Sequence, residues 1–572
     1  MALQQLNKRW TLKPAPKEVA AHLHQALNIH PVLCRLLSLR GIDTYAAAKQ
    51  FFRPDMNDLH DPFLMKGMAQ AADRICEAVE WNERILVYGD YDVDGTTAVA
   101  VMYSFLRDHY TGVLSFYIPH RYREGYGISK AGVDFAIANG YTLMITLDCG
   151  IKSVELIAYA KSHGIDVIIC DHHTPDQVLP PAFAILNPKQ PDCPYPFKEL
   201  SGCGIGYKLI CALAGKWQLP AERTTRFLDL VATSIAADIV PVDGENRVLA
   251  YFGIKKANEN PCLSIETLKN ISGLVRDITL TDLVFAIGPK INAAGRMDDA
   301  RKAVDLFIEK DPEKIKELAA VLMTDNTDRK EVDKNITEEA LSLLENDTML
   351  GSKKSTVLYK EHWHKGVVGI VASRLIDYCY KPTIVLAMSN GKVSGSARSV
   401  IGFNVYEAIY ECRELLENYG GHFYAAGITM KPENYLPFVR KFEEVVSGTI
   451  DPRLLVPEIE IDAEIELEDI KPAFYNIIRQ FEPFGPNNMR PVFCTRNVYD
   501  YQGNSRIVKE QHIKFVITNR RGIVIDGIGF KMADKFPYTH PGPFDIVYTL
   551  DENEFNGSTK LQIKVLDIRP SY

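Results

Sequence analysis

An acid-rich turn, Asp90-Tyr-Asp-Val-Asp-Gly95, most constrains the fold of this 572-residue chain. It follows the apolar run 85–89 and precedes the helix-favouring stretch 96–106. This order predicts a buried strand, a turn and a helix, and open α/β sheets bind ligands at the carboxyl ends of their strands. Three carboxylates this close repel one another unless a cation lies among them. We therefore predict a Mg²⁺ or Mn²⁺ site, with an acidic surface turn as the alternative.

The succession of apolar strand and acid recurs twice further along the chain. Residues 143–148 end with an aspartate, and residues 167–173 end with Asp171-His-His173. The helical stretch 153–163 lies between them, so the two strands form a right-handed parallel unit whose acids share a sheet edge with Asp90. The paired imidazoles shift the metal preference toward Mn²⁺ or a similar transition ion.

A fourth acid, Asp238, follows the long apolar stretch 227–237. It could simply end a helix before residues 239–241. An acid at a helix C-terminus opposes the helix macrodipole, however, and needs a compensating positive charge. A metal ion at the same edge would supply that charge.

Four segments, in this order, resemble the motifs of the DHH phosphoesterase superfamily. They are Asp90-Tyr-Asp-Val-Asp-Gly95, Leu147-Asp-Cys-Gly150, Asp171-His-His173 and Ala236-Ala-Asp-Ile-Val240. Further segments are similar to those of the RecJ family of single-strand-specific DNA exonucleases within it, namely residues 121–127, 288–297, 364–374, 394–399 and 420–427. The resemblance runs from about residue 50 to the C-terminus.

The resemblance implies two bound ions, Mn²⁺ or Mg²⁺, bridged by Asp148. The implied ligands of one ion are Asp94, Asp148, His172 and Asp238, and those of the other are Asp92 and Asp148, with Asp90 supporting or ligating. Several superfamily members have a histidine four residues before Asp92, where this chain has Tyr88, so we assign the outer ligand of the first ion to Asp90. His173 would face the scissile phosphate. The implied catalytic set is Asp92, Asp94, Asp148, His172 and His173.

The resemblance also implies a second lobe that grips the nucleotide next to the cut, including its 5′-phosphate. Gly420-Gly421 follows a predicted helix over 404–418. The two glycines favour equally a helix C-cap and a backbone nest for an anion. In the segment 394–399, small residues leave room for one arginine fork that can bind phosphate. The expected substrate-binding residues are Ser396, Arg398, Gly421 and His422, with Arg121, Asn292 and Arg296 from the first lobe.

We expect an α/β multidomain fold with five regions. They are an N-terminal helical segment (1–70), a parallel-sheet DHH catalytic domain (71–310), a connecting helix (311–350), a smaller α/β, DHHA1-like substrate-binding domain (351–450) and an OB-fold β-barrel (451–572). Residues 312–346 carry one apolar stripe, which favours one long helix over two shorter ones that break near Asp325-Asn326. Short alternating runs beyond residue 457 predict the barrel.

The predicted barrel is rich in basic and aromatic side chains. They are Arg506, Lys509, His512, Lys514, Arg520 and Arg521, with Tyr499, Tyr501 and Phe515. Such a mixture can track a single strand of nucleic acid while stacking its bases. A solvated barrel face with the aromatic rings in the core is an equal alternative.

The composition of the chain bears on whether it binds nucleic acid, crosses a membrane or is secreted. The formal net charge of −8 argues mildly against a nucleic-acid binder, so any DNA contact must come from local basic stripes. The sequence contains no run of ~18 apolar residues, so we expect no membrane-spanning helix, and the N-terminus lacks a signal-peptide pattern. Eleven cysteines without a C-x-x-C pair fit reduced thiols and a cytoplasmic location.

Together these observations predict a two-metal exonuclease of single-stranded DNA. The 5′-to-3′ direction, the release of mononucleotides and a role in DNA repair and recombination are what the resemblance implies. It also implies a single-strand-binding protein and a RecQ-type helicase as partners. Two alternatives stay open. One is a phosphodiesterase for short oligoribonucleotides or cyclic dinucleotides, against which the extra ~115 C-terminal residues count. The other is a non-catalytic DNA-binding scaffold, which would have lost the acids and the histidine pair.

Overall fold

The structure, a computed structural model, describes residues 7–555 and 558–571. It divides into two compact units. The parallel-sheet unit comprises residues 49–328 and 481–489, and the mixed-sheet unit comprises residues 1–48, 329–480 and 490–572. Among the described residues, no helix is long and apolar enough to cross a membrane.

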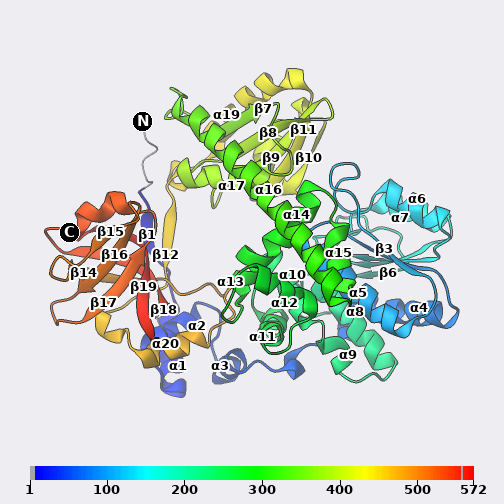
Figure 1. The fold of residues 1–572 in the computed structure, drawn as a ribbon, viewed down its shortest axis with the longest axis horizontal. Helices are drawn as coiled ribbons and strands as arrows, with labels where there is room; N and C mark the ends of the chain where they lie inside the picture. Colours follow the sequence, from blue (N-terminus) through cyan, green and yellow to red (C-terminus); the bar gives the residue numbers. More distant parts are fainter. Residues whose placement is uncertain (1–6, 556–557, 572) are drawn as a thin grey trace. The chain divides into compact units, whose positions relative to one another are not determined.

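A five-stranded parallel sheet forms the centre of the parallel-sheet unit (Figure 1). Its order is β3-β2-β4-β5-β6. The strands are β2 (Ile85–Gly89), β3 (Leu114–Tyr117), β4 (Leu143–Leu147), β5 (Asp166–Cys170) and β6 (Ala184–Leu186). The predicted parallel sheet is confirmed, and its strands β2, β4 and β5 are direct neighbours.

Helices cover both faces of this sheet because alternate strand residues point to opposite sides. Ile85 and Val87 belong to the core beneath α4 (Met68–Glu80), α5 (Val93–His109) and α8 (Gly202–Lys216). Leu86 and Tyr88 belong to the core beneath α6 (Lys130–Ala138) and α7 (Val154–Ser162). Strands buried on both sides are expected to be largely apolar, as β2 is along its whole length and β4 is apart from Thr146. The remaining helices of the unit are α9 (Glu222–Thr225), α10 (Leu228–Ala237), α11 (Gly244–Glu259), α12 (Leu263–Ile271), α13 (Leu280–Asp282), α14 (Gly288–Met297) and α15 (Arg301–Ile308), with a π-helix at Leu283–Ile287.

One continuous helix, α16 (Pro312–Glu345), follows α15. The prediction of one long helix is confirmed, and the predicted alternative of a break near Asp325-Asn326 is wrong. The division between the two units falls within α16, between Asp328 and Arg329.

The mixed-sheet unit contains a five-stranded sheet of order β10-β11-β9-β8-β7. Its strands are β7 (Thr356–Lys360), β8 (Thr383–Ser389), β9 (Lys392–Arg398), β10 (Asn418–His422) and β11 (Ala425–Met430), and its helices are α17 (Val368–Tyr378), α18 (Val405–Tyr410) and α19 (Tyr435–Thr449). The helix predicted over 404–418 is wrong beyond Tyr410, because a 3-10 turn at Arg413–Leu415 follows and leads into β10, which pairs with β11 as a hairpin. Gly420 and Gly421 therefore lie in β10, and the helix C-cap predicted for them is wrong.

A second sheet of the same unit has the order β13-β14-β18-β19-β17-β16-β15. An additional pairing between β14 and β16 closes five of these strands into a ring, which agrees with the predicted OB fold. The strands are β13 (Ala463–Glu464), β14 (Phe493–Asp500), β15 (Arg506–Val508), β16 (His512–Thr518), β17 (Val524–Gly529), β18 (Phe544–Phe555) and β19 (Ser558–Pro570), with α20 (Pro472–Arg479).

The N-terminal segment is not wholly helical, in contrast to the expectation from the sequence. Its strand β1 (Arg9–Leu12) pairs in parallel with β12 (Glu458–Ile461). The helices α1 (Lys17–Leu27), α2 (Pro31–Ser38) and α3 (Tyr45–Phe52) follow. A four-residue strand whose partner lies more than four hundred residues away has no local sequence signal strong enough to identify it.

Candidate metal centre

Three neighbouring strands deliver acids to one edge of the parallel sheet. Asp90 follows β2, Asp148 follows β4 and Asp171 follows β5. The prediction that these acids share an edge is confirmed by the strand pairing. Asp148 has a φ of 60°, a left-handed conformation that aspartate tolerates better than most residues. Strained backbone of this kind concentrates at functional sites.

Asp94 lies in the first turn of α5 and is held by donors from two other helices. The N–H groups of Gly202 and Cys203, at the start of α8, each donate to its carboxylate over 2.7 Å. Ser234 Oγ of α10 donates over 2.6 Å. A carboxylate at a helix N-terminus is favoured by the macrodipole, and these three donors hold the Asp94 side chain in place. A Cβ at position 202 would lie 2.6 Å from the Asp148 Cβ, so glycine lets α8 approach both acids.

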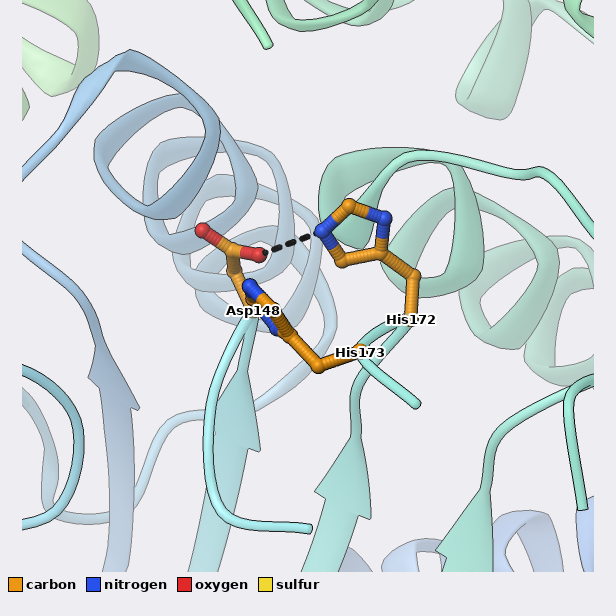
Figure 2. Close-up of side chains that lie close together, drawn as sticks. All are labelled: Asp148, His172 and His173. Carbon is orange, nitrogen blue, oxygen red and sulfur yellow. Dashed lines mark ion pairs between the residues drawn. The ribbon is translucent and has the colours of Figure 1, made fainter. Parts of the chain in front are cut away.

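The carboxylates converge on the imidazole of His172. Its Nε2 lies 3.2 Å from Asp148 Oδ1, 3.5 Å from Asp238 Oδ2 and 3.9 Å from Asp94 Oδ2. Figure 2 shows the carboxylate of Asp148 facing this ring, with His173 beside it. Among the described residues, two sets offer ligand atoms within 4.8 Å of one another: Asp94, His172 and Asp238, and Asp148, His172 and His173.

Burial makes this cluster electrostatically unbalanced. It raises the pKa of Asp148 and Asp238 well above the usual range, and the neighbouring Asp94 raises both further. Burial also lowers the pKa of His172 to about 4, so the imidazole is neutral at pH 7. Asp148 Oδ1 and His172 Nε2 are buried and have no hydrogen-bond partner among the described residues. Orphaned oxygen and imidazole nitrogen atoms that face one another fit a divalent cation.

Asp90 and Asp92 lie beside the cluster and belong to neither of these sets. Gly127 N–H donates to Asp90 Oδ1 over 3.2 Å, while Asp90 Oδ2 is buried without a hydrogen-bond partner in the described part of the chain. Asp92 caps α5 and accepts from Gly95 N–H over 3.0 Å. Burial raises the pKa of both carboxyls. The negative charge of Asp92 raises the pKa of Asp90 further, and that of Asp94 raises the pKa of Asp92 further. A second cation near these two acids would relieve that repulsion.

His173 is held differently from His172. Its Nδ1 lies 2.7 Å from Asp171 Oδ1, and its Nε2 lies 3.0 Å from the hydroxyl of Tyr126. Burial alone would raise the pKa of Asp171, but its bonds to His173 and to Ile151 N–H lower it to about 2. Burial lowers the pKa of His173, but the bond to Asp171 outweighs this and raises it. Asp171 therefore orients His173 and favours its charged form.

Arg121, and the helix that carries Asn292 and Arg296, lie beside the acid-rich turn. The Arg121 guanidinium lies 4.4 Å from the ring centre of Tyr91. Asn292 and Arg296 belong to α14, whose Gly295 approaches the turn so closely that a Cβ there would lie 2.9 Å from the Tyr91 carbonyl oxygen. The Tyr122 hydroxyl donates to the carbonyl of Arg296.

The predicted residues of the mixed-sheet unit also form one group. Arg398 of β9 pairs with Ala425 of β11, which pairs with His422 of β10, so the three residues form one row across the sheet. Arg398 Nη1 donates to Ser396 Oγ over 2.6 Å. Gly369, in the first turn of α17, is so near that a Cβ there would lie 3.1 Å from Arg398 Nη2. Gly421 is more tightly constrained, because a Cβ there would lie 2.3 Å from the Ala425 carbonyl oxygen.

Sequence reasoning missed the groups that hold the predicted ligands. Gly202, Cys203 and Ser234 fix Asp94, and Tyr126 contacts His173. Ser201 before an apolar, glycine-rich run is a helix N-cap signal that could have indicated the start of α8. Tyr126 lay in a recognised segment, but nothing local assigned it a role.

Three family models match the chain. "DHH family, N-terminal domain" matches residues 84–235, "DHHA1 domain" matches residues 352–448 and "RecJ OB domain" matches residues 461–567. The single-stranded-DNA-specific exonuclease RecJ of Bacillus subtilis is 36% identical over 98% of this chain and 70% of its own length. The protein of that name from Haemophilus influenzae is 32% identical over 95% of this chain and 97% of its own length.

Solved structures agree with these matches. RecJ from Thermus thermophilus in complex with Mn²⁺ has a TM-score of 0.84 at 26% identity, covering 99% of this chain and 80% of that chain. The complex of the same protein with Mg²⁺ has a TM-score of 0.79 at 25% identity, covering 99% of this chain and 79% of that chain. From the domain order, the identities and the shared fold, the chain belongs to the RecJ family of single-stranded-DNA-specific exonucleases.

Proposed function

We propose that the protein is a divalent-metal-dependent exonuclease that degrades single-stranded DNA from 5′ to 3′ to mononucleotides, in DNA repair and recombination. The observation that carries this is the convergence of Asp94, Asp148 and Asp238 on a neutral His172. Relatives named single-stranded-DNA-specific exonuclease, and a relative solved with Mn²⁺ and with Mg²⁺, support the substrate and the ion.

Two ions would be held at the sheet edge. Asp94, Asp148, His172 and Asp238 would hold one, and Asp92 and Asp148 the other, with Asp90 beside it. When bound, such a pair supplies an activated water and stabilises charge on a phosphoryl group. This scheme needs no side-chain nucleophile, and Gly202, Cys203 and Ser234 hold the Asp94 carboxylate in place as a ligand.

His173 would contact the scissile phosphate. Its ring is fixed by Asp171 at Nδ1, and its raised pKa favours the charged form that an anionic phosphate attracts. The hydroxyl of Tyr126 lies at the other ring nitrogen and limits rotation of the imidazole. Arg121, Asn292 and Arg296 would contact phosphates near the acid-rich turn.

We assign the 5′-phosphate to the row formed by Arg398, Ala425 and His422 across the sheet of the mixed-sheet unit. Arg398 and Ser396 lie beside the first turn of α17, where helix N–H groups favour anions, and His422 lies in the same row of the sheet. Gly421 allows the backbone of β10 and β11 to approach closely. Arg398→Lys would keep the charge but lose the fork, so this variant is expected to lose most of the preference for a 5′-phosphorylated oligonucleotide over its 5′-hydroxyl counterpart.

The ring-forming sheet offers a further contact for single-stranded DNA. Arg506, Lys514 and Lys564 occupy one transverse row, because Lys514 pairs with both Arg506 and Ile528, and Ile528 pairs with Lys564. The side chain of Phe530 is exposed, and its ring centre lies 5.7 Å from Lys564 Nζ. Cations beside an exposed ring suit a strand backbone with stacked bases. Phe515, expected among these aromatics, lies in the core instead.

Digestion of 5′-labelled and 3′-labelled single strands, with and without Mn²⁺, tests the proposal. The 5′ label should leave at once as a mononucleotide, whereas the 3′-labelled strand should shorten gradually, and EDTA should stop both. Early release of a 3′-labelled mononucleotide would refute the direction. Cleavage of short oligoribonucleotides alone would favour the phosphodiesterase, and binding without cleavage would favour the scaffold.

The protein partners and the cytoplasmic location stay predictions. Co-purification with a single-strand-binding protein and with a RecQ-type helicase would test the partners.

A further inference from the structure

Tyr88 occupies the position at which several members of the superfamily have a histidine. It belongs to β2, two residues before Asp90, and is fully buried. Its ring stacks on Tyr117 at 5.4 Å between centres. Helix α6 packs so closely on it that a Cβ at Gly132 would lie 2.5 Å from Tyr88 Cε2. A buried phenol needs hydrogen-bond partners, so the contacts of its hydroxyl define its role.

The hydroxyl bonds to both ends of a short segment. Tyr88 Oη donates to the Gly127 carbonyl oxygen and accepts from Ser129 N–H, each over 3.0 Å. Gly127 has a φ of 81°, a conformation that glycine adopts without strain. Both hydrogen-bonding capacities of the phenol are thus used on the segment 127–129.

The preceding residues are gathered by Glu124. Its carboxylate accepts from His120 N–H over 2.8 Å, from the Tyr117 hydroxyl over 2.9 Å and from Ser129 Oγ over 2.5 Å. Residues 120–129 therefore form one ordered loop, which we call the tyrosine loop. Glu124 orders it from within, and Tyr88 ties it to the strand that leads to Asp90.

The tyrosine loop touches the candidate metal centre at two points. Gly127 N–H donates to Asp90 Oδ1 over 3.2 Å, which leaves the buried Asp90 Oδ2 without a hydrogen-bond partner in the described chain. Tyr126 Oη lies 3.0 Å from His173 Nε2. Movement of residues 126–127 would therefore change the orientation of both groups.

We propose that Tyr88 is a positioning residue of the metal centre, whose hydroxyl fixes the tyrosine loop so that Gly127 orients Asp90 toward a bound cation. This inference rests on the proposed function. Partners that orient a metal ligand typically change metal affinity 10- to 100-fold when they are removed. The Tyr88 hydroxyl would not itself bind the cation, because its oxygen is hydrogen-bonded to Gly127 and Ser129.

Tyr88→Phe tests the proposal, since it removes one oxygen and keeps the stacked ring. Mn²⁺ binding, measured on the intact protein by electron paramagnetic resonance of the free ion, should weaken about 10-fold. Tyr195→Phe is the matched control. Tyr195 is equally buried, and its hydroxyl donates to Glu245 over 2.6 Å. That variant should unfold more readily but bind Mn²⁺ as the wild type does.

Each outcome decides between separate claims. A wild-type protein that binds no Mn²⁺ would refute the proposed function itself. Wild-type affinity in a folded Tyr88→Phe protein would overturn only the role of Tyr88. If Tyr88→Phe does not fold, Glu124→Gln loosens the same loop from within. An unchanged Mn²⁺ affinity in that variant would equally overturn the inference.

Discussion

Two buried clusters of charge in the parallel-sheet unit are built in opposite ways. Lys208 of α8 and Glu245 of α11 are 2% and 1% exposed at their side chains, with Nζ and Oε1 2.7 Å apart. Glu245 also accepts from His60 N–H and from the Tyr195 hydroxyl, and Lys208 donates to the His60 carbonyl oxygen. The chain itself thus neutralises and hydrogen-bonds this pair, which links the loop at residue 60 to two helices.

The metal centre has no such balance of its own. Its carboxylates face a histidine that is neutral at pH 7, and three of its buried polar atoms, on Asp90, Asp148 and His172, lack hydrogen-bond partners among the described residues. Buried charge is costly unless it is paired. The comparison teaches that this fold pairs buried charge where the role is structural, and leaves an anionic excess where a cation is to bind.

The largest expected effect comes from removing one charge at the metal centre. Asp148→Asn should lower the rate of single-strand digestion about a thousand-fold, or about 4 kcal/mol, because the residue would contact both ions. Initial rates on a 5′-labelled strand in Mn²⁺ measure this. Asp134→Asn, which removes an exposed carboxylate that pairs with Lys130, is the control and should digest at the normal rate. Full activity in Asp148→Asn would contradict the assignment.

Breaking the balanced pair should instead reduce stability. Lys208→Met leaves Glu245 buried and unpaired, so the free energy of unfolding should fall by about 3 kcal/mol. Urea unfolding monitored by circular dichroism measures the loss. Adding Glu245→Leu to the same protein should restore part of it, since an apolar pair can replace a buried ion pair. A loss below about 1 kcal/mol would show that the pair has little structural weight.

Added Mn²⁺ should stabilise the metal centre and have no effect on the buried pair. At a concentration 100 times its Kd, one ion adds about 2.7 kcal/mol to the free energy of unfolding. Thermal unfolding should shift upward in the wild type and in Lys208→Met, and should stay unchanged in Asp148→Asn. An equal shift in all three proteins would indicate binding elsewhere.

The smallest expected effect is a pH dependence of the metal-free protein. The pKa of Asp148 and Asp238 is raised in the folded state above the ordinary 3.8, so the folded state binds their protons more tightly. Stability from these groups is present below pH 3.8 and is lost as the pH rises through their folded pKa values. In EDTA, Asp148→Asn should therefore be more stable than the wild type at pH 8, by about 1 kcal/mol, and the difference should shrink toward pH 5.

The pKa of Asp171 is shifted in the opposite direction, so this residue gives an internal check on the pH dependence of stability. Its pKa is lowered to about 2, so its stabilising effect is present above pH 3.8 and is lost only as the pH falls toward 2. Urea titrations at pH 5, 6.5 and 8 therefore report the raised carboxyls without interference from Asp171. A stability difference that grows toward pH 5 would contradict the assigned direction.

Local pattern was enough to predict the elements that carry the acids. The predicted strand over 85–89 corresponds to β2, and the stripe over 312–346 corresponds to α16. Apolar runs and helical spacing are properties of neighbouring residues, so a single sequence contains them. The shared edge of Asp90, Asp148 and Asp171 followed because parallel strands with right-handed crossovers bring their carboxyl ends together.

Long-range partners could not be predicted in the same way. The donors to Asp94 lie 108 to 140 residues further along the chain, and nothing in a single sequence pairs them. The helix predicted over 404–418 was wrong for a more local reason. It ends at Tyr410, and the chain then leads into residues 418–422, whose hairpin pairing with β11 outweighs local helix preference. Two glycines that follow the predicted helix were consistent with either structure.

The closure of five strands into a ring has a consequence for self-association. Every strand of the ring has a neighbour on each side, and the strands at the ends of the sheet, β13 and β15, are only two and three residues long. Exposed edges with free N–H and C=O groups are where one protein chain can extend the sheet of another. This sheet offers little such edge to template aggregation, and whatever binds its outer face must be recognised by side chains rather than by strand addition.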